Sequence, residues 1–285
     1  MIRSLATAAL CTALALGSAG RADDPPAAPK KLTGDELAKM IAKLSYDSKP
    51  LDKTFTQVIM DRAGWRSVLS VSVAADGSLV WFEAALTVAS FPEDVPAATW
   101  RKLLAKNEEL LPTSFTFNKD RKRVYLMHAI PNADVTPAVL RTNLELMDRT
   151  IEQTQPVWKL ANFVPPVSAD GLKQLDALAG KWTATALSDQ GKELSAEAAK
   201  LSFTFEKDKF SLSKDGKVIR SGQLVAATAD GTTRLDRYDT GVSAHGIYKL
   251  DGDTLTWCYS TTVRPTKFAA DAKTLTTLYV LKRDK

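Results

Sequence analysis

The last third of the chain alternates short apolar runs with Asp-Gly turns, and this pattern restricts the fold more than any other feature of the sequence. Asp-Gly pairs stand at 215–216, 230–231 and 251–252. A tight hairpin turn needs positive φ at its two central residues, which Asp and Gly tolerate. The stretch from Gly246 to Tyr259 shows the pattern most clearly, because alternating runs flank its turn on both sides. The pattern predicts consecutive antiparallel hairpins.

The same criterion, applied along the whole C-terminal part, predicts a closed β-barrel. A short helix is expected over 172–179. Strands are expected over 181–187, 200–206, 209–213, 217–226, 232–238, 244–250, 253–260 and 274–283. Eight short strands at regular spacing favour an up-and-down barrel, in which closure removes the free sheet edges. We therefore predict an all-β, eight-stranded barrel domain over 172–285.

The preceding part of the chain mixes helical and strand periodicity and predicts a separate α+β domain over 35–160. Helices are expected over 33–46, 96–111 and 136–158, and strands over 54–60, 66–74, 79–87, 113–118 and 123–130. The order αβββαββα indicates an antiparallel sheet with helices. The pair Pro165-Pro166 favours extended backbone and ends the last helix, so a linker is expected over 161–171.

Residues at the N-terminus form the pattern of a secretory signal peptide over 1–22. Arg3 precedes an apolar run over 5–16, which small residues follow up to Ala22. The run is shorter than the roughly 20 residues that a membrane-spanning helix needs. We expect export to the periplasm or beyond, with a disordered, proline-rich tether over 23–34 and no membrane span. Cys11 leaves a lipoprotein alternative open, although Leu10 precedes it where such processing sites carry a small residue.

The α+β part resembles the class I type III secretion chaperones and the related bacterial sensory-transduction regulators. The resemblance covers about 35–158. It rests on the element order and on the helix Trp100-Arg-Lys-Leu-Leu-Ala-Lys-Asn107 with the hairpin and helix after it. It implies binding of extended protein segments and dimerisation through this domain, and it transfers no binding residue. A signal peptide conflicts with the cytoplasmic role of such chaperones.

The C-terminal part resembles the lipocalin-like domain of planctomycete proteins over about 172–285. The matching motifs are Leu178-Ala-Gly-Lys-Trp182, Phe203-Thr-Phe-Glu-Lys-Asp-Lys-Phe210, Asp215-Gly-Lys-Val218, Gly246–Leu255, Cys258, Arg264-Pro-Thr-Lys-Phe268 and Leu281-Lys-Arg283. That family implies no established activity. Gly180-Lys-Trp182 is also similar to the Gly-x-Trp signature of true lipocalins. The similarity implies that Gly180, Trp182 and Arg283 close one end of the barrel and form the floor of any cavity.

The sequence leaves open whether that barrel is filled or hollow, because eight strands accommodate either a packed interior or one small ligand. Aromatic residues alternate along the predicted strands and would line a cavity or form a core: Phe203, Phe205, Trp257 and Tyr259. Arg264 and Lys267, before the last strand, would contact an anionic ligand or lie in a solvated loop.

No catalytic, metal or cofactor site is predicted. The chain has two histidines, His128 and His245, which fall in different domains. His128 lies in an apolar strand, where a hydrogen-bonded, partly buried imidazole is expected. The sharpest catalytic alternative places His245 opposite Cys258 across adjacent strands. Otherwise Cys258 is expected to be a small core residue. Clustered His/Cys spacing for a metal and a glycine-rich phosphate loop are both missing.

The formal charge of +5 is spread along the 285 residues, so no nucleic-acid partner is expected. The sequence favours a non-enzymatic, exported protein that binds a protein or ligand at the cell envelope. A lipocalin-type carrier of a small apolar molecule and an export-linked chaperone of a partner polypeptide remain the alternatives.

Overall fold

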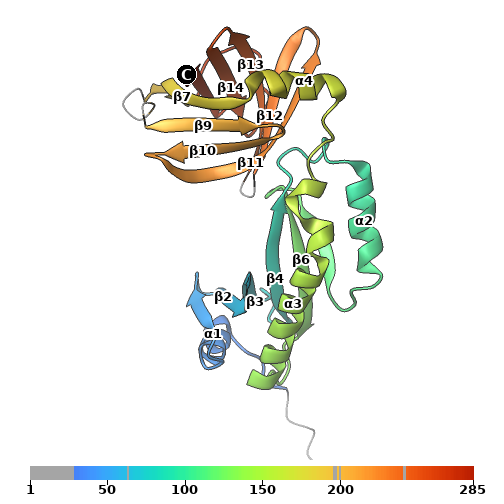
Figure 1. Cartoon of the computed structure of the whole chain (residues 1–285). Helices are drawn as coiled ribbons and strands as arrows, with labels where there is room; N and C mark the ends of the chain where they lie inside the picture. The colour runs from blue at the N-terminus through green and yellow to red at the C-terminus, as the bar shows by residue number, and fades with distance from the viewer. Residues whose placement is uncertain (1–28, 63, 195–197, 199, 240–241) are drawn as a thin grey trace, which may run out of the picture.

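The computed structural model describes residues 29–62, 64–194, 198, 200–239 and 242–285. The predicted signal peptide over 1–22, with Cys11, and residues 23–28 of the expected tether lie outside the described residues. Figure 1 shows two bodies, an α+β domain below and a β-barrel above, joined by the chain between their helices. The predicted fold class is confirmed.

The α+β domain holds a six-stranded antiparallel sheet in the order β1-β2-β3-β4-β6-β5. Its strands are β1 (Asp47–Pro50), β2 (Phe55–Arg62), β3 (Trp65–Val73), β4 (Leu79–Val88), β5 (Ser114–Asn118) and β6 (Arg123–Pro131). Its helices are α1 (Gly34–Ala42), α2 (Ala97–Asn107) and α3 (Pro137–Trp158), followed by a 3-10 turn, η1 (Leu160–Asn162).

Side chains at the helix starts explain where two of these helices begin. Thr33 and Glu36 form a capping box at α1, in which each side chain accepts from the other residue's backbone N–H. Thr136 accepts from the N–H of Val139 at α3, and Pro137 occupies the first helical position. These contacts satisfy N–H groups that have no partner inside the helix.

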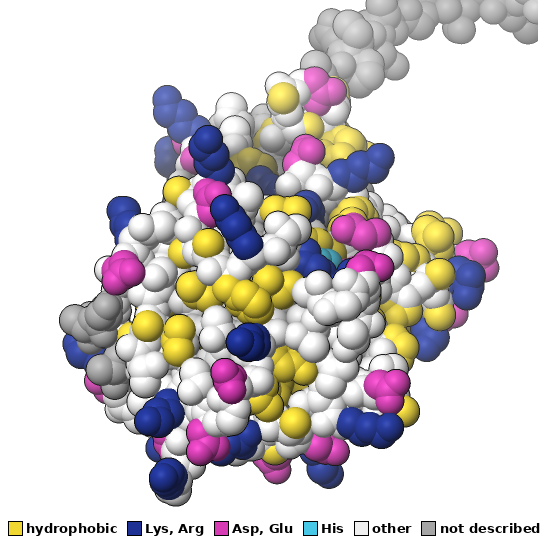
Figure 2. Space-filling model, turned by 90° about the horizontal axis from the view of Figure 1, so that it is seen from above, with side chains coloured by type: hydrophobic (Ala, Val, Ile, Leu, Met, Phe, Trp, Pro, Cys, Tyr) yellow, Lys and Arg dark blue, Asp and Glu magenta, His cyan; other side chains and the backbone are white. Residues whose placement is uncertain are grey.

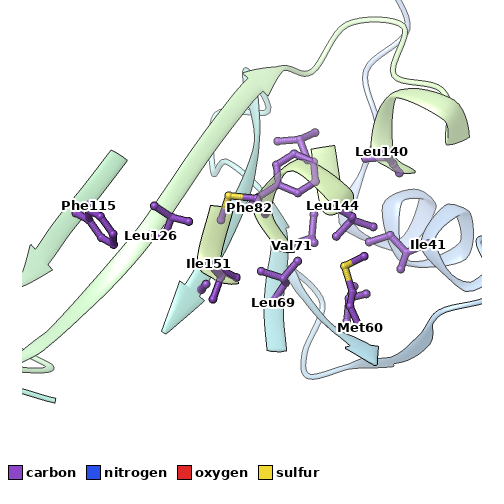
Figure 3. Packing of buried hydrophobic residues seen from close by; sticks show 14 of the residues in the cluster. Ile41, Met60, Leu69, Val71, Phe82, Phe115, Leu126, Leu140, Leu144 and Ile151 are labelled. Carbon is purple, nitrogen blue, oxygen red and sulfur yellow. The ribbon is translucent and has the colours of Figure 1, made fainter. Parts of the chain in front are cut away.

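All three helices pack on one face of this sheet. Inward residues of the strands form one buried cluster with residues of α1, α2 and α3. Figure 3 shows Ile41, Leu140 and Leu144 pointing toward the sheet side chains Val71 and Phe82. Because side chains alternate across a strand, the intervening residues lie on the opposite face, which no helix in the described part of the chain covers.

Two differences from the sequence prediction concern the edge and the start of this domain. The short edge strand β1 was not predicted, because Ser48-Lys-Pro50 is polar and contains a proline that edge positions tolerate. The expected tether is ordered at its end. Leu32 is buried, and it exchanges hydrogen bonds with the Asn132 side chain, 2.9 Å each way.

The second domain is a closed antiparallel barrel of eight strands. They are β7 (Gly180–Asp189), β9 (Leu201–Glu206), β10 (Lys209–Lys214), β11 (Lys217–Ala229), β12 (Thr232–Asp239), β13 (Ser243–Asp251), β14 (Thr254–Ser260) and β15 (Thr276–Arg283). The last strand pairs with the first, from Thr277 opposite Asp189 to Arg283 opposite Trp182, and this pairing closes the barrel. A two-residue strand, β8 (Lys192–Glu193), adds to β7 outside the ring.

Helix α4 (Ala169–Leu178) precedes the barrel and packs against it. It begins earlier than the predicted helix because Ser168 caps it, accepting from the N–H of Gly171 at 3.0 Å. Leu175 and Leu178 are buried in the barrel's hydrophobic cluster. Within the described part of the chain, no helix has the length and apolar character needed to cross a membrane.

Candidate functional site

The uncovered face of the N-terminal sheet carries apolar side chains where a purely solvated face would be polar. Antiparallel sheets commonly turn one polar face to water. Here Val68 is 44% exposed, and Phe55, Trp81 and Met127 on the same face are half-buried. Of these four side chains, only Val68 is largely exposed, and neighbouring side chains partly shelter the other three. Contiguous exposed apolar side chains on a soluble domain mark interaction surfaces.

Two adjoining hollows indent this face. One of about 290 Å³ and one of about 280 Å³ share four lining residues: Phe55, Glu83, Arg121 and Tyr125. Ala85 and Arg123 extend the second hollow, and Met127 extends the first. We call this set of residues the sheet-face site. Its walls come from β2, β4 and β6 and from the turn between β5 and β6.

Charge is concentrated at one end of the sheet-face site. Arg121 Nη1 donates to the Tyr125 hydroxyl at 3.3 Å, which fixes the guanidinium above the sheet. Burial raises the pKa of Glu83, and the positive charge of Arg121 opposes that rise. Arg123 lines one of the hollows, and Asp52, from the loop before β2, lines the same one. The site therefore combines apolar side chains with polar ones and has two arginines at its rim.

The structure brings together the residues that were predicted to close one end of the barrel. The Arg283 guanidinium lies over the Trp182 ring, 4.3 Å from its centroid. Arg283 also donates to the carbonyls of Ala177, at 2.7 Å, and of Ala179, at the end of α4. Gly180 has φ +119°, a backbone conformation that side-chain-bearing residues rarely adopt. Together these contacts tie the first strand, the last strand and α4 into one closed end.

The four aromatic residues proposed to line a cavity pack against one another inside the barrel. Ring centroids lie 5.8 Å apart for Phe203 and Trp257, 6.3 Å for Phe205 and Trp257, and 5.0 Å for Trp257 and Tyr259. Trp257 is fully buried and donates to the Leu235 carbonyl at 3.0 Å. These contacts are those of a hydrophobic core, in which edge-to-face pairs add about 0.5–1.5 kcal/mol each beyond burial.

The two residues proposed for an anion contact lie in the loop between β14 and β15. Arg264 forms a two-pronged ion pair with Asp236, at 2.5 and 2.7 Å, and also donates to the Gly246 carbonyl at 2.8 Å. Its guanidinium is thus engaged by a buried carboxylate. Lys267 is exposed and borders a hollow of about 220 Å³ on the outside of the barrel.

The suggested pairing of His245 with Cys258 does not occur. His245 lies opposite Ser260, and Cys258 lies opposite Ile247, two positions further along the strands. Cys258 is buried, burial raises the pKa of its thiol, and its Sγ contacts the Ala269 carbonyl at 3.6 Å. A thiol of this kind is a poor nucleophile, since the thiolate is the reactive form.

His128 has the hydrogen-bonded setting expected of it. Its Nε2 lies 2.7 Å from Asn143 Oδ1, and its Nδ1 lies 3.3 Å from the Pro112 carbonyl. Among the described residues, no group of three or more His, Cys, Asp or Glu side chains is arranged to hold a metal ion.

Two groups of residues that meet in the structure were not predicted from the sequence. The sheet-face site draws its residues from separate strands, and only their alternation with core positions could have placed them on one face. The second group lies between the domains: His245 Nε2 is 2.6 Å from Asp94 Oδ2 of the α+β domain. No local signal in the sequence links these two residues.

Comparison with known proteins gives a likeness of fold in the N-terminal part. A chain of the crystal structure of the ExsC–ExsE complex is similar over 45% of this chain and 97% of its own, with 17% identity and a TM-score of 0.35. A chain of the heterodimeric ExoU–SpcU complex from the type III secretion system of Pseudomonas aeruginosa is similar over 43% and 98%, with 12% identity and a TM-score of 0.33. Likenesses of this size carry no information about function.

No protein-family model matches the chain. No curated protein matches it either. The C-terminal domain has the architecture of an eight-stranded antiparallel barrel.

Proposed function

We propose that this chain is an exported, non-enzymatic protein that binds a polypeptide on the sheet-face site of its α+β domain. The observation that carries the proposal is the uncovered sheet face with its two adjoining hollows. A chain segment laid across them would cover Phe55 and the half-buried Trp81 and Met127. Burial of apolar surface stabilises such a complex by roughly 25 cal/mol per Å² before the costs of association.

The charge of the site selects the chemistry of the partner. Arg121 lines both hollows and Arg123 lines one, while Glu83 lines both and Asp52 lines one. Arginine pairs with carboxylates through two parallel hydrogen bonds. The partner segment is therefore acidic, with an apolar or aromatic side chain to fill a hollow. A second copy of this chain would bring the same arginine-bearing rim against itself.

The barrel supports a scaffold role in this proposal. Its closed end resembles that of lipocalin-like domains, since Trp182 and Arg283 stack as the Gly-x-Trp motif implies. Its aromatic core favours a packed interior over a carrier of a small apolar molecule. The signal-peptide pattern supports a location in the periplasm or outside the cell. An export-linked chaperone would be one form of the same polypeptide-binding protein.

The proposal is tested by panning a phage-displayed library of random peptides against the protein from residue 23 onward. We expect enrichment of acidic peptides that carry an aromatic or aliphatic residue. Ala85→Glu places a negative charge in the hollow, and Arg121→Glu reverses the charge at its rim. Each should weaken the selected peptides about tenfold or more, which corresponds to about 1.4 kcal/mol.

The matched control is Ala138→Glu, at an exposed position of α3 on the helix-covered side. It should leave peptide affinity unchanged. Peptides that bind wild type and Ala85→Glu equally would contradict the site. Native mass spectrometry adds a separate outcome: a stable homodimer that Ala85→Glu dissociates would show that this face binds a second copy instead.

A further inference from the structure

The two domains meet at a compact polar and aromatic contact centred on His245. The contact residues of the α+β domain lie in the loop between β4 and α2. Phe91 stacks on the His245 ring, with centroids 3.4 Å apart and planes inclined by 13°. Asp94 lies 2.6 Å from the same imidazole, and the Ser243 N–H donates to Ser90 Oγ at 3.1 Å. His245 is only 7% exposed.

Charged groups surround the imidazole from each element packed against it. Asp94 comes from the interdomain loop, and Asp236 Oδ2 of β12 lies 4.0 Å from Nε2. Arg264 approaches from the loop after β14 and holds Asp236 in its two-pronged pair. Lys122, from the turn between β5 and β6, lies 5.6 Å from the centroid of the Phe91 ring. Tyr238 is the other titratable neighbour of Asp236 on β12.

This arrangement fits a neutral imidazole better than an imidazolium. A neutral ring can stack on Phe91 and remain buried without the cost of desolvating a charge. A protonated ring would be buried beside the Arg264 guanidinium, which already neutralises Asp236. The Lys122 ammonium already lies near the Phe91 ring, so a protonated imidazole would share the cation–π attraction of that ring with a second positive charge. Asp94 attracts a protonated ring, but its side chain is 36% exposed and keeps part of its hydration.

The direction of the pKa agrees with this geometry. Burial, the largest influence, lowers the pKa of His245 below its ordinary value of 6.5, and Arg264 acts in the same sense. Asp236 and Asp94 oppose the shift. When the domains separate, the ring regains water and binds a proton more readily. Docking is therefore complete above the ordinary histidine pKa and weakens as the pH falls below it.

We propose that His245 is a pH-sensitive latch between the two domains, which holds them together at neutral pH and releases them on acidification. His245 lies between Phe91 and Asp94 at the centre of the contact, so a change in its charge acts directly on the docking of the domains. The latch is independent of the sheet-face proposal, because it concerns only the docking of the two domains.

Two variants separate the latch from mere loss of structure. His245→Gln keeps a polar side chain at the contact but cannot be protonated. Asp94→Asn removes the carboxylate from a half-exposed side chain in a loop, outside either core. His128 serves as an internal reference, since its partners all lie within the α+β domain.

The test measures the radius of gyration by small-angle X-ray scattering from about pH 7.5 to about pH 5, with NMR titration of both histidines. Wild type should expand as His245 gains its proton, with a fall in the docking constant of about tenfold or more. His245→Gln should show no such expansion, and Asp94→Asn should be less compact at every pH. A wild-type radius that stays constant while His245 titrates, or expansion that persists in His245→Gln, would overturn the proposal.

Discussion

The identity of a single residue in this protein can be set by close contact with a neighbouring strand. Gly246 opens the hairpin that first indicated the barrel, yet its role is one of packing. A Cβ at this position would lie 2.5 Å from the Leu235 carbonyl oxygen and 2.6 Å from Trp257 Nε1. These two atoms form the hydrogen bond that satisfies the buried indole. A buried donor that loses its acceptor costs about 1–3 kcal/mol.

We therefore expect Gly246→Ala to destabilise the barrel by about 1–3 kcal/mol, because the added methyl group forces strands or the indole apart. Urea denaturation followed by tryptophan fluorescence measures the loss. Lys249→Ala, on an exposed position of the same strand, is the control and should change stability by less than about 0.5 kcal/mol. Equal stability of Gly246→Ala and wild type would show that the strands adjust without cost.

At the scale of elements, local chemistry made the strands and helices predictable. Each Asp-Gly turn and each alternating run acts over a few neighbouring residues, so the barrel strands were placed within about three residues of their observed ends. The sequence did not predict the edge strand β1, because a proline such as Pro50 argues against a strand unless that strand is known to lie at the edge of a sheet. The sheet-face site could not be predicted, since Glu83, Arg121 and Tyr125 meet only after strand pairing fixes the register.

The contact between β15, β7 and α4 gives the prediction at this scale. Arg283→Ala removes the guanidinium that stacks on Trp182. It also removes the two hydrogen bonds that this group donates to the carbonyls of Ala177 and Ala179. We expect a loss of about 1–3 kcal/mol. Arg283→Lys should recover only part of it, because an ammonium lacks the planar fork. Thermal unfolding followed by near-ultraviolet circular dichroism should show that stability decreases from wild type to Arg283→Lys to Arg283→Ala. Full recovery in the lysine variant would mean that charge alone is sufficient.

At the scale of the whole molecule, the two domains have separate cores and a small contact. One buried cluster ends at Phe163, and the other begins at Leu175. Each cluster draws its members from one domain only. The connection between them contains Pro165-Pro166, which extends the chain and forms no part of either sheet. Domains joined in this way commonly fold as independent units.

Cleavage at a protease site inserted after Val164 should therefore leave both halves folded. We expect each fragment to keep its near-ultraviolet circular dichroism and to melt cooperatively. The fragments should separate on gel filtration at about pH 5, where the His245 contact is weakened, and more slowly at about pH 7.5. Uncleaved protein carrying the same insertion is the control. Loss of structure in either fragment on cleavage would show that its core depends on the other.

The pairing of β15 with β7 also sets the order in which the barrel can be completed during synthesis. Thr276–Arg283 must leave the ribosome before Gly180–Asp189 finds its second neighbour. Until then, the strands already made present two unpaired edges, the form of a sheet most prone to join other chains. A nascent chain of this protein is thus vulnerable to aggregation for the whole time that the 86 intervening residues, 190–275, take to be translated. If the chain crosses a membrane unfolded, the pairing of β15 with β7 takes place only on the far side.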